Sequence, residues 1–398
     1  MTIRTGSAPA AAPGPAASVP AASVPAASVP AASVAAPEGR RALRAALLVP
    51  AAVALLTGLD AALLRLGLPA PIRTDRLPAV HGMPLVFGFL TTLIALERAV
   101  ALRRPAGFAA PVLTGLGGLA LLSPAPLKVG QITLLAGVAV FAAVHVPLWR
   151  RQRARGVAVQ AFAAALGAGA LLLWLGDVTV PALLPWLVAF LVLTVAAERL
   201  ELARLDRGTH EDAFVVLAAA VGVGAVAALL WPETGTVLFG LTLLSLLGWL
   251  VRYDVARRTV RSRGLPRYVA GCTLAAYGWL AVAAAAWVLG GPAPEGPRYD
   301  AVVHAVFLGF TMSMVFAHAP VILPAVLHCR LPYHPVLIVP ATLLHASLVV
   351  RLWLGDARGH HGAWQTGGVG NIVALLVFAG VAVALASGLL RPGSRDLR

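Results

Sequence analysis

The strongest constraint in this sequence is a succession of apolar runs, each about twenty residues long, between residues 44 and 391. A helix needs about 20 apolar residues to cross the hydrocarbon core of a bilayer. Lipid offers no partner for backbone N–H and C=O groups, so a spanning segment is a helix or part of a closed barrel. The runs are rich in Leu, Ala and Val and lack the alternation of a strand. They therefore predict an all-α, polytopic membrane protein with the lipid bilayer as its main partner.

Composition supports this class. Hydrophobic residues make up 59% of the chain and charged residues only 12%, whereas a soluble domain has about 25% charged residues. The net charge of +15 raises the possibility of a nucleic-acid partner. However, the Arg residues stand in short clusters between apolar runs, where they orient a membrane protein. We therefore expect no nucleic-acid binding.

Twelve transmembrane segments account for the apolar runs. Their expected ranges are 44–67, 78–101, 107–124, 127–149, 156–176, 178–203, 212–231, 234–252, 268–290, 298–324, 335–354 and 367–391. Of the 31 Lys and Arg residues, 24 lie in the N-terminal tail, the loops after even-numbered segments or the C-terminus. Positive residues favour the cytoplasmic side. The pattern predicts a multi-pass protein of a bacterial plasma (inner) membrane with cytoplasmic N- and C-termini.

The chain divides into a tail and a membrane domain. Residues 1–39 contain PAASV four times and little that could form a core. This composition is typical of disorder, and we interpret the segment as a cytoplasmic tail without a signal peptide. Residues 40–398 form the twelve-helix domain.

Two histidines are the leading functional candidates, because imidazole groups at membrane depth are costly and usually serve a function. His81 follows the start of the second segment by about three residues, and His304 follows the start of the tenth by about six. Both segments run in the same direction, so the two imidazoles lie at similar depth near the outer face. We therefore predict that they bind a haem iron from opposite sides. The alternative is a pair of hydrated histidines at helix ends.

Neighbouring residues fit a haem site. Asp300 precedes His304 by four residues, so it can accept the outer ring N–H and fix the tautomer. Gly82, Gly88 and Gly309 would let a flat macrocycle approach the backbone. Arg351, at the outer end of the eleventh segment, is placed to pair with haem propionates.

His318 and His345 form a possible second, deeper site. His318 follows His304 by fourteen residues, which is about 21 Å along a helix. One haem therefore cannot bind both. The favoured alternative for His318 is an N–H donor or a packing residue beside the kinks at Pro320 and Pro324.

A Glu-Arg pair recurs near the ends of the second and sixth segments, at Glu97–Arg98 and Glu198–Arg199. The two segments are four apart, and with the tenth they suggest three four-helix quasi-repeats. Glu97, Glu198 and Glu201 are possible proton-transfer residues, or simple ion-pairing residues at helix ends.

The stretches VHGMPLVFGFLTTLIALERAVAL (80–102) and YDAVVHAVFLGFTMSMVFAHAPVILPAVL (299–327) give the chain a family resemblance. The chain resembles the haem-copper oxidase subunit I superfamily, especially divergent relatives of the NnrS type. The resemblance implies low-spin haem b held by His81 and His304, with Arg351 as propionate partner.

The chain departs from that family at the copper site. The sixth, seventh and eighth segments contain no histidine, and the tenth lacks a closely spaced second histidine. We therefore expect no copper at the usual haem-copper site.

Three functions remain open at this point. The first is a haem-binding membrane protein for electron transfer or a role related to nitric oxide or oxygen. The second is a twelve-helix solute transporter, with Glu97, Glu198, Glu201 and His318 as a proton relay. The third is a non-catalytic subunit or assembly factor of a respiratory complex. Under the first and third functions, a respiratory-chain subunit or redox protein is the expected partner.

Overall fold

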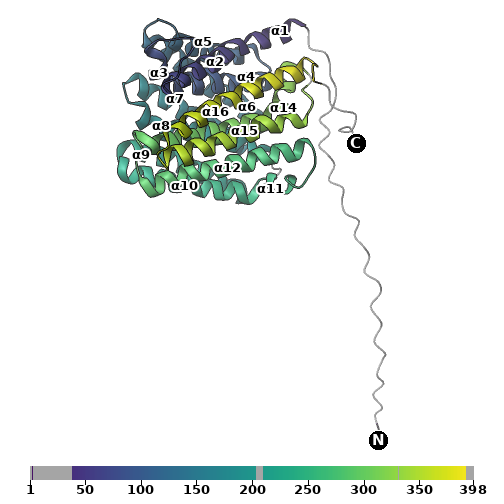
Figure 1. Cartoon of the computed structure of the whole chain (residues 1–398). Coiled ribbons are helices and arrows are strands. Elements are labelled where there is room, and N and C mark those ends of the chain that lie inside the picture. The colour runs from purple at the N-terminus through teal and green to yellow at the C-terminus, as the bar shows by residue number, and fades with distance from the viewer. Residues whose placement is uncertain (1, 3–37, 203–208, 330, 391–398) are drawn as a thin grey trace.

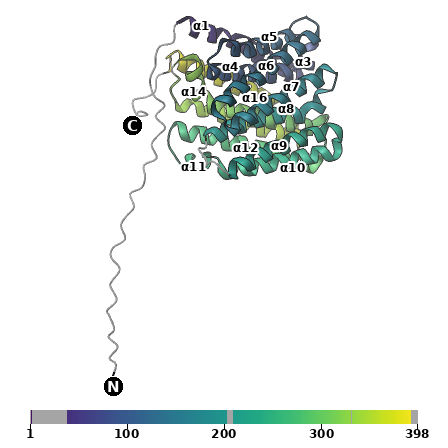
Figure 2. The ribbon, with the colours of Figure 1, turned by 180° about the vertical axis from the view of Figure 1, so that it is seen from behind.

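The computed structural model describes residues 2, 38–202, 209–329 and 331–390 (Figure 1). Long helices lie side by side across the molecule, and the described residues contain no strand (Figures 1 and 2). The start of α1 (Glu38–Ala46) and the end of α16 (His361–Ala386) lie at one end of the bundle, which we call the terminal end. The short helix α3 (Arg76–Val80) lies at the opposite end. Most of the predicted tail, residues 1–39, falls outside the described residues.

The remaining helices follow in chain order. They are α2 (Leu48–Arg65), η1 (Pro84–Leu90), α4 (Thr91–Leu102), η2 (Pro105–Phe108), α5 (Ala109–Leu122), α6 (Leu127–Gln152), α7 (Arg155–Leu175), α8 (Val180–Leu202), α9 (Thr209–Leu230), α10 (Pro232–Tyr253), α11 (Ala256–Thr259), α12 (Leu265–Gly290), α13 (Gly296–His304), η3 (Ala305–Met312), α14 (Ser313–Leu327), η4 (Pro335–Leu337), α15 (Ile338–Val349) and η5 (Val350–Asp356).

Within the described residues, twelve helical stretches are long and apolar enough to cross a membrane. This confirms the predicted all-α, multi-pass architecture. Most predicted boundaries lie within three residues of the observed ones. The second stretch begins at Pro84 instead of 78, because the regular helix is interrupted at His81 between α3 and η1. The last begins at His361 instead of 367, since a polar first turn precedes its apolar part.

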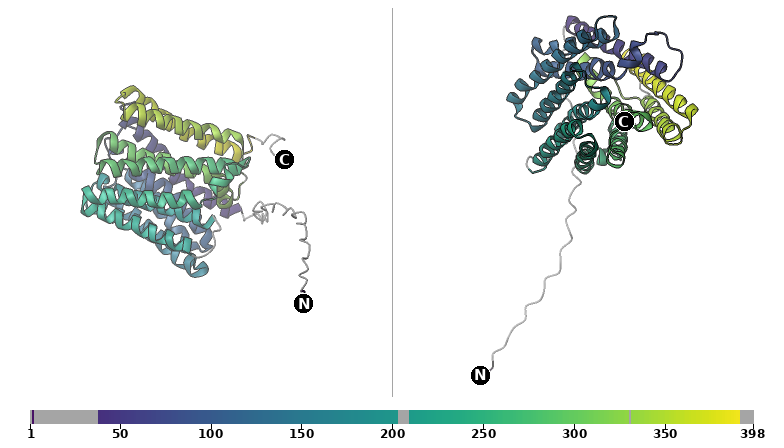
Figure 3. Two further views of the ribbon diagram at one scale, coloured as in Figure 1. Left: turned by 90° about the horizontal axis from the view of Figure 1, so that it is seen from below. Right: turned by 90° about the vertical axis from the view of Figure 1, so that its left-hand side faces the viewer.

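Every fourth span lies inside the bundle. The second, sixth and tenth spans are 61%, 72% and 61% buried, whereas the other nine are 33–56% buried. These inner spans contact one another, α4 against α14 and α8 against η3. The other helices surround them when the bundle is seen from one end (Figure 3, right). This arrangement fits three four-helix quasi-repeats, each of which contributes one inner span.

Close helix contacts depend on glycine at particular positions. A Cβ built on Gly118 of α5 would lie 2.7 Å from the Cα of Gly88 in η1. Small residues allow membrane helices to approach this closely, which strengthens their van der Waals contact. Gly88 therefore joins the second span to the third.

Candidate functional site

A cavity near the α3 end of the bundle is lined by both predicted ligands, His81 and His304, and by Arg351. We call it the histidine cavity. Most of its other lining residues are apolar, including Leu184 and Leu187 of the sixth span. Its volume is about 110 Å³. The structure thus brings together the two histidines that were paired by their expected depth, and it places the predicted arginine beside them.

His81 is oriented by a bond to another helix. Its Nδ1 atom lies 3.0 Å from the carbonyl oxygen of Gly58 in α2. A carbonyl only accepts hydrogen bonds, so Nδ1 carries the proton and Nε2 keeps its lone pair. This is the tautomer that a metal-binding imidazole requires.

His304 has the same tautomer for a similar reason. Its Nδ1 atom lies 2.9 Å from the carbonyl oxygen of Asp300 and 3.2 Å from the carboxylate Oδ1 of the same residue. This is the contact predicted from their four-residue spacing. The bond to the carbonyl four residues earlier also occurs at His145 and His318, so it does not by itself mark a ligand. His81 and His304 differ from the other two histidines because they share a cavity and because His81 is bonded to α2.

Asp300 also holds Arg351. The Arg351 Nε and Nη2 atoms donate to the two carboxylate oxygens of Asp300, both at 2.8 Å, and Trp364 Nε1 donates to Oδ2 at 3.2 Å. Two parallel bonds between a guanidinium and a carboxylate form a strong, oriented pair. One carboxylate therefore connects His304 of α13 to the arginine of η5.

An amide in the wall of the histidine cavity has an unused donor. Asn371 of α16 is 2% exposed, and its Oδ1 accepts a bond from Ser347 Oγ at 2.7 Å. Its buried Nδ2 has no hydrogen-bond partner within the protein. Buried polar groups are usually paired, and an unpaired one calls for a ligand or another explanation. Asn371 was not among the predicted site residues, because a lone Asn in an apolar segment forms no recognisable motif.

Three π-helical segments surround the histidine cavity. The segment η1 begins three residues after His81, η3 begins directly after His304, and η5 contains Arg351. A π-helical turn holds an extra residue, and such turns are frequent at functional sites. The sequence did not reveal these segments, since their apolar residues are equally compatible with an α-helix.

Two of the three glycines assigned to a macrocycle pack against helices instead. Gly88 meets Gly118, and a Cβ on Gly309 would lie 2.3 Å from Cγ of Trp279. The expectation that Gly88 and Gly309 admit a macrocycle is therefore wrong. Gly82 lines the histidine cavity and has no atom within 4 Å of an added Cβ, so the expectation still stands for this glycine.

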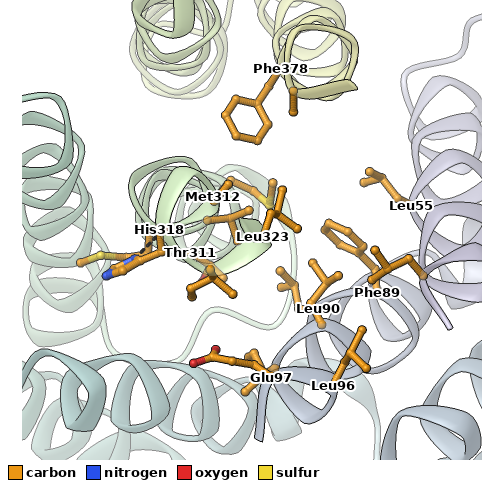
Figure 4. Close-up of a pocket in the computed structure, with 18 of the residues that line it drawn as sticks. Leu55, Phe89, Leu90, Leu96, Glu97, Thr311, Met312, His318, Leu323 and Phe378 are labelled. Carbon is orange, nitrogen blue, oxygen red and sulfur yellow. Dashed lines mark hydrogen bonds between the residues drawn. The ribbon is translucent and has the colours of Figure 1, made fainter. Parts of the chain in front are cut away.

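A second cavity extends toward the terminal end. We call it the glutamate cavity, and it has a volume of about 300 Å³. Its polar or ionisable lining side chains are those of Glu97, Glu198, Thr311 and His318 (Figure 4 labels three of these four). The remaining walls are apolar. Leu55, Phe89, Leu90, Met312 and Leu375 line both cavities, so the two spaces adjoin within the bundle.

The ionisable residues of the glutamate cavity occupy matching positions in the three inner spans. Each follows a buried phenylalanine by eight residues. The pairs are Phe89 and Glu97, Phe190 and Glu198, and Phe310 and His318. This shared spacing was the signal in the sequence that would have placed His318 beside the two glutamates.

Ion pairs join the inner spans around this cavity. Arg98 Nη2 lies 3.0 Å from Glu97 and 3.4 Å from Glu198. The two glutamates therefore share a guanidinium. The side chain of Glu201, the third predicted member of this group, lies outside the described residues.

Arg199 forms a separate buried network. Its Nε and Nη2 atoms donate to Asp254 at 2.7 and 2.6 Å, and Tyr277 donates to the same carboxylate at 2.6 Å. Burial alone would raise the pKa of Asp254, but the bonds from Arg199 hold it below its ordinary value. Arg199 also lies 3.4 Å from Nε2 of His318. Asp254 was not among the predicted site residues, because it follows the predicted end of the eighth segment at residue 252.

His318 and His345, which were predicted as a possible second site, have different surroundings. His318 lines the glutamate cavity, whereas His345 is not among its lining residues and accepts a bond from Trp279 Nε1 at 3.0 Å. In the part of the chain that the structure describes, no group of three or more His, Cys, Asp or Glu side chains could hold a metal ion. A second metal site at these residues stays a prediction.

Comparison with known proteins gives one match. The family described as a domain of unknown function (DUF8744) matches residues 44–387. No curated protein and no solved structure matches the chain. The family match covers all twelve spans, with only the outermost residues of the first omitted. The chain therefore belongs to the DUF8744 family.

Proposed function

We propose that this protein binds haem b in the membrane, with His81 and His304 as the two axial ligands. The observation that carries the proposal is the shared cavity. Both histidines line it, and both have Nδ1 bonded to an oxygen acceptor, which leaves Nε2 for the iron. Two neutral imidazoles with fixed tautomers are a typical low-spin haem ligand set.

The remaining polar side chains of the cavity suit the acidic edge of a porphyrin. Arg351 and the unpartnered Nδ2 of Asn371 are hydrogen-bond donors in the cavity wall. A propionate would accept from both. Because Asp300 neutralises Arg351, Asn371 gains importance as a neutral donor.

The volume of the histidine cavity limits how a porphyrin can fit. The histidine cavity, at about 110 Å³, is smaller than the usual range of small-molecule sites, about 300–1,000 Å³. The glutamate cavity adjoins it through five shared side chains, among them the unbranched, flexible side chain of Met312. Entry of a porphyrin requires these side chains to move toward the glutamate cavity.

Electron transfer is the role that this ligand set favours. A bound haem would supply a one-electron carrier, and His81 and His304 would hold its iron. With both histidines bound, no position would be open for a gas molecule, so a role with nitric oxide or oxygen would require one histidine to dissociate. The side chains of this protein would have three tasks. They would hold the iron, fix the imidazole tautomers through Gly58 and Asp300, and exclude water with apolar walls.

The same proposal includes the cellular setting. The Lys and Arg distribution supports a bacterial inner membrane with the terminal end in the cytoplasm. The histidine cavity would then lie toward the outer face, near a redox partner or a respiratory-chain subunit on that side.

Haem content of purified variants tests the proposal. Cells supplied with a haem precursor should yield protein with about one haem per chain, and His81→Ala or His304→Ala should remove most of it. His360→Ala is the matched control, because His360 is exposed at the start of α16 and lines neither cavity. Normal haem content in both ligand variants would refute the assignment.

A solute transporter is the second candidate. It is favoured by the ionisable residues Glu97, Glu198 and His318, which line one cavity at matching positions of the inner spans. Proton-coupled uptake of a solute into liposomes by haem-free protein, abolished by Glu97→Gln, would support this candidate over the first.

A further inference from the structure

The glutamate cavity has the features of a ligand site of its own. Thr311 is 3% exposed and lines the cavity, and its hydroxyl has no hydrogen-bond partner within the protein. Other buried hydroxyls on the inner spans have partners: Thr91 donates to the carbonyl of Val86, and Thr194 to that of Phe190. Thr311 lies in the π-helical segment η3. Its unpaired hydroxyl calls for a ligand group.

The other polar end of the cavity accepts hydrogen bonds. Glu97 presents a carboxylate, and its side chain is 25% exposed. His318 donates from Nδ1 to the Met314 carbonyl at 2.7 Å and accepts at Nε2 from Arg199 Nη1 at 3.4 Å, so Glu97 is the acceptor at this end. Figure 4 shows Glu97, Thr311 and His318 around the cavity, with Phe89 and Phe378 among the apolar side chains. A ligand group at this end must therefore donate a proton in a hydrogen bond.

The remaining walls of the cavity are apolar and partly aromatic. Phe89, Phe378 and the Met312 and Met314 side chains in the walls suit an aromatic ring.

The wall of the cavity extends to the outer surface of the bundle. Val383, near the end of α16, lines the cavity and is 66% exposed. An apolar tail can therefore extend past α16 into the bilayer while the ring stays inside. This route fits a molecule that dissolves in the membrane.

We propose that the glutamate cavity binds a lipid-soluble hydroquinone, with one hydroxyl at Thr311 and the other donating to Glu97. The oxidised quinone has no O–H group, so it cannot donate to the carboxylate of Glu97. An alkyl amine cannot accept from Thr311 once it is protonated. The proposal does not require that haem is bound in the histidine cavity.

The test uses full-length protein in lipid nanodiscs and a benzohydroquinone with a ten-carbon tail, kept under nitrogen. Isothermal titration should show that the hydroquinone binds about tenfold or more tightly than its oxidised quinone, since one charged hydrogen bond is lost. Thr311→Val should weaken both compounds several-fold. Leu323→Trp, which fills the cavity lined by Leu323, should abolish binding of both.

The matched control is Thr273→Val. Thr273 is a fully buried threonine of α12 that donates to the Val269 carbonyl and does not line the cavity, so its variant should bind both compounds normally. The proposal is overturned if folded wild-type protein binds neither compound, or binds both equally. It is also overturned if Thr311→Val and Leu323→Trp bind like the wild type. Haem content, measured separately, reports on the other proposal.

Discussion

Arg351 and Asp300 form a two-bond ion pair between the eleventh and tenth spans, with Nε–Oδ2 and Nη2–Oδ1 distances of 2.8 Å. Asp300 simultaneously accepts from Trp364 and lies 3.2 Å from His304 Nδ1. Both members of the pair are largely buried, at 8% and 19% side-chain exposure. The pair therefore fixes the position of the proposed axial ligand as well as the packing of two spans.

Removing one partner should cost more than removing both. Asp300→Leu leaves a buried guanidinium without its carboxylate and should lower the free energy of unfolding by about 3 kcal/mol. Asp300→Leu combined with Arg351→Leu should recover much of that loss. Equilibrium unfolding in mixed micelles gives both values, and a double-mutant cycle gives the coupling energy. Additive losses from the two single variants would show that the pair contributes no coupling.

The contact between Gly88 and Gly118 should tolerate no added methyl group. A Cβ on Gly118 would meet backbone at 2.7 Å, so Gly118→Ala should destabilise the protein by about 1–3 kcal/mol through overpacking.

Gly278→Ala in α12 is the matched control, because an added Cβ there has no atom within 4 Å. This variant should be neutral or slightly stabilising, since Ala favours a helix more than Gly does. Thermal unfolding in detergent compares the two. Equal midpoints for both variants would contradict the packing role assigned to Gly118.

The twelve-helix architecture was predictable because it depends on local features of the sequence. Long apolar runs and the Arg clusters between them are visible without any tertiary information, and they gave all twelve spans. The approach of His81 and His304 was also predictable, since depth in a membrane follows from position within a span. The structure places both in one cavity.

Features that depend on tertiary packing were not predictable in the same way. Asp254 pairs with Arg199 across 55 positions of sequence, and neither residue stands in a recognisable motif with the other. Gly309 was assigned to a macrocycle because it lies near His304 in the sequence, whereas its contact with Trp279, thirty residues earlier, depends on tertiary packing. The eight-residue spacing that aligns His318 with the two glutamates was present in the sequence, but a histidine in place of a glutamate concealed it.

Asn371 should affect haem retention without acting as an iron ligand. If its Nδ2 donates to a propionate, Asn371→Leu should increase the rate of haem loss to an apo-globin acceptor about tenfold, the value of one hydrogen bond to a charged group. The absorption spectrum of the bound haem should stay unchanged, because the axial ligands remain.

Ser347→Ala is the control for packing, since it removes the bond to Oδ1 of Asn371 and leaves Nδ2 in place. A rate of haem loss unchanged in Asn371→Leu, or raised equally in Ser347→Ala, would argue against a propionate contact.

The most direct test of the central claim is the dithionite-reduced absorption spectrum of purified wild-type protein, recorded before and after addition of carbon monoxide. Two histidine ligands predict the sharp bands of six-coordinate, low-spin haem b, unchanged by carbon monoxide because no axial position is open. Folded protein that contains no haem after expression with a haem precursor would contradict the claim. A rapid spectral shift with carbon monoxide would contradict it as well.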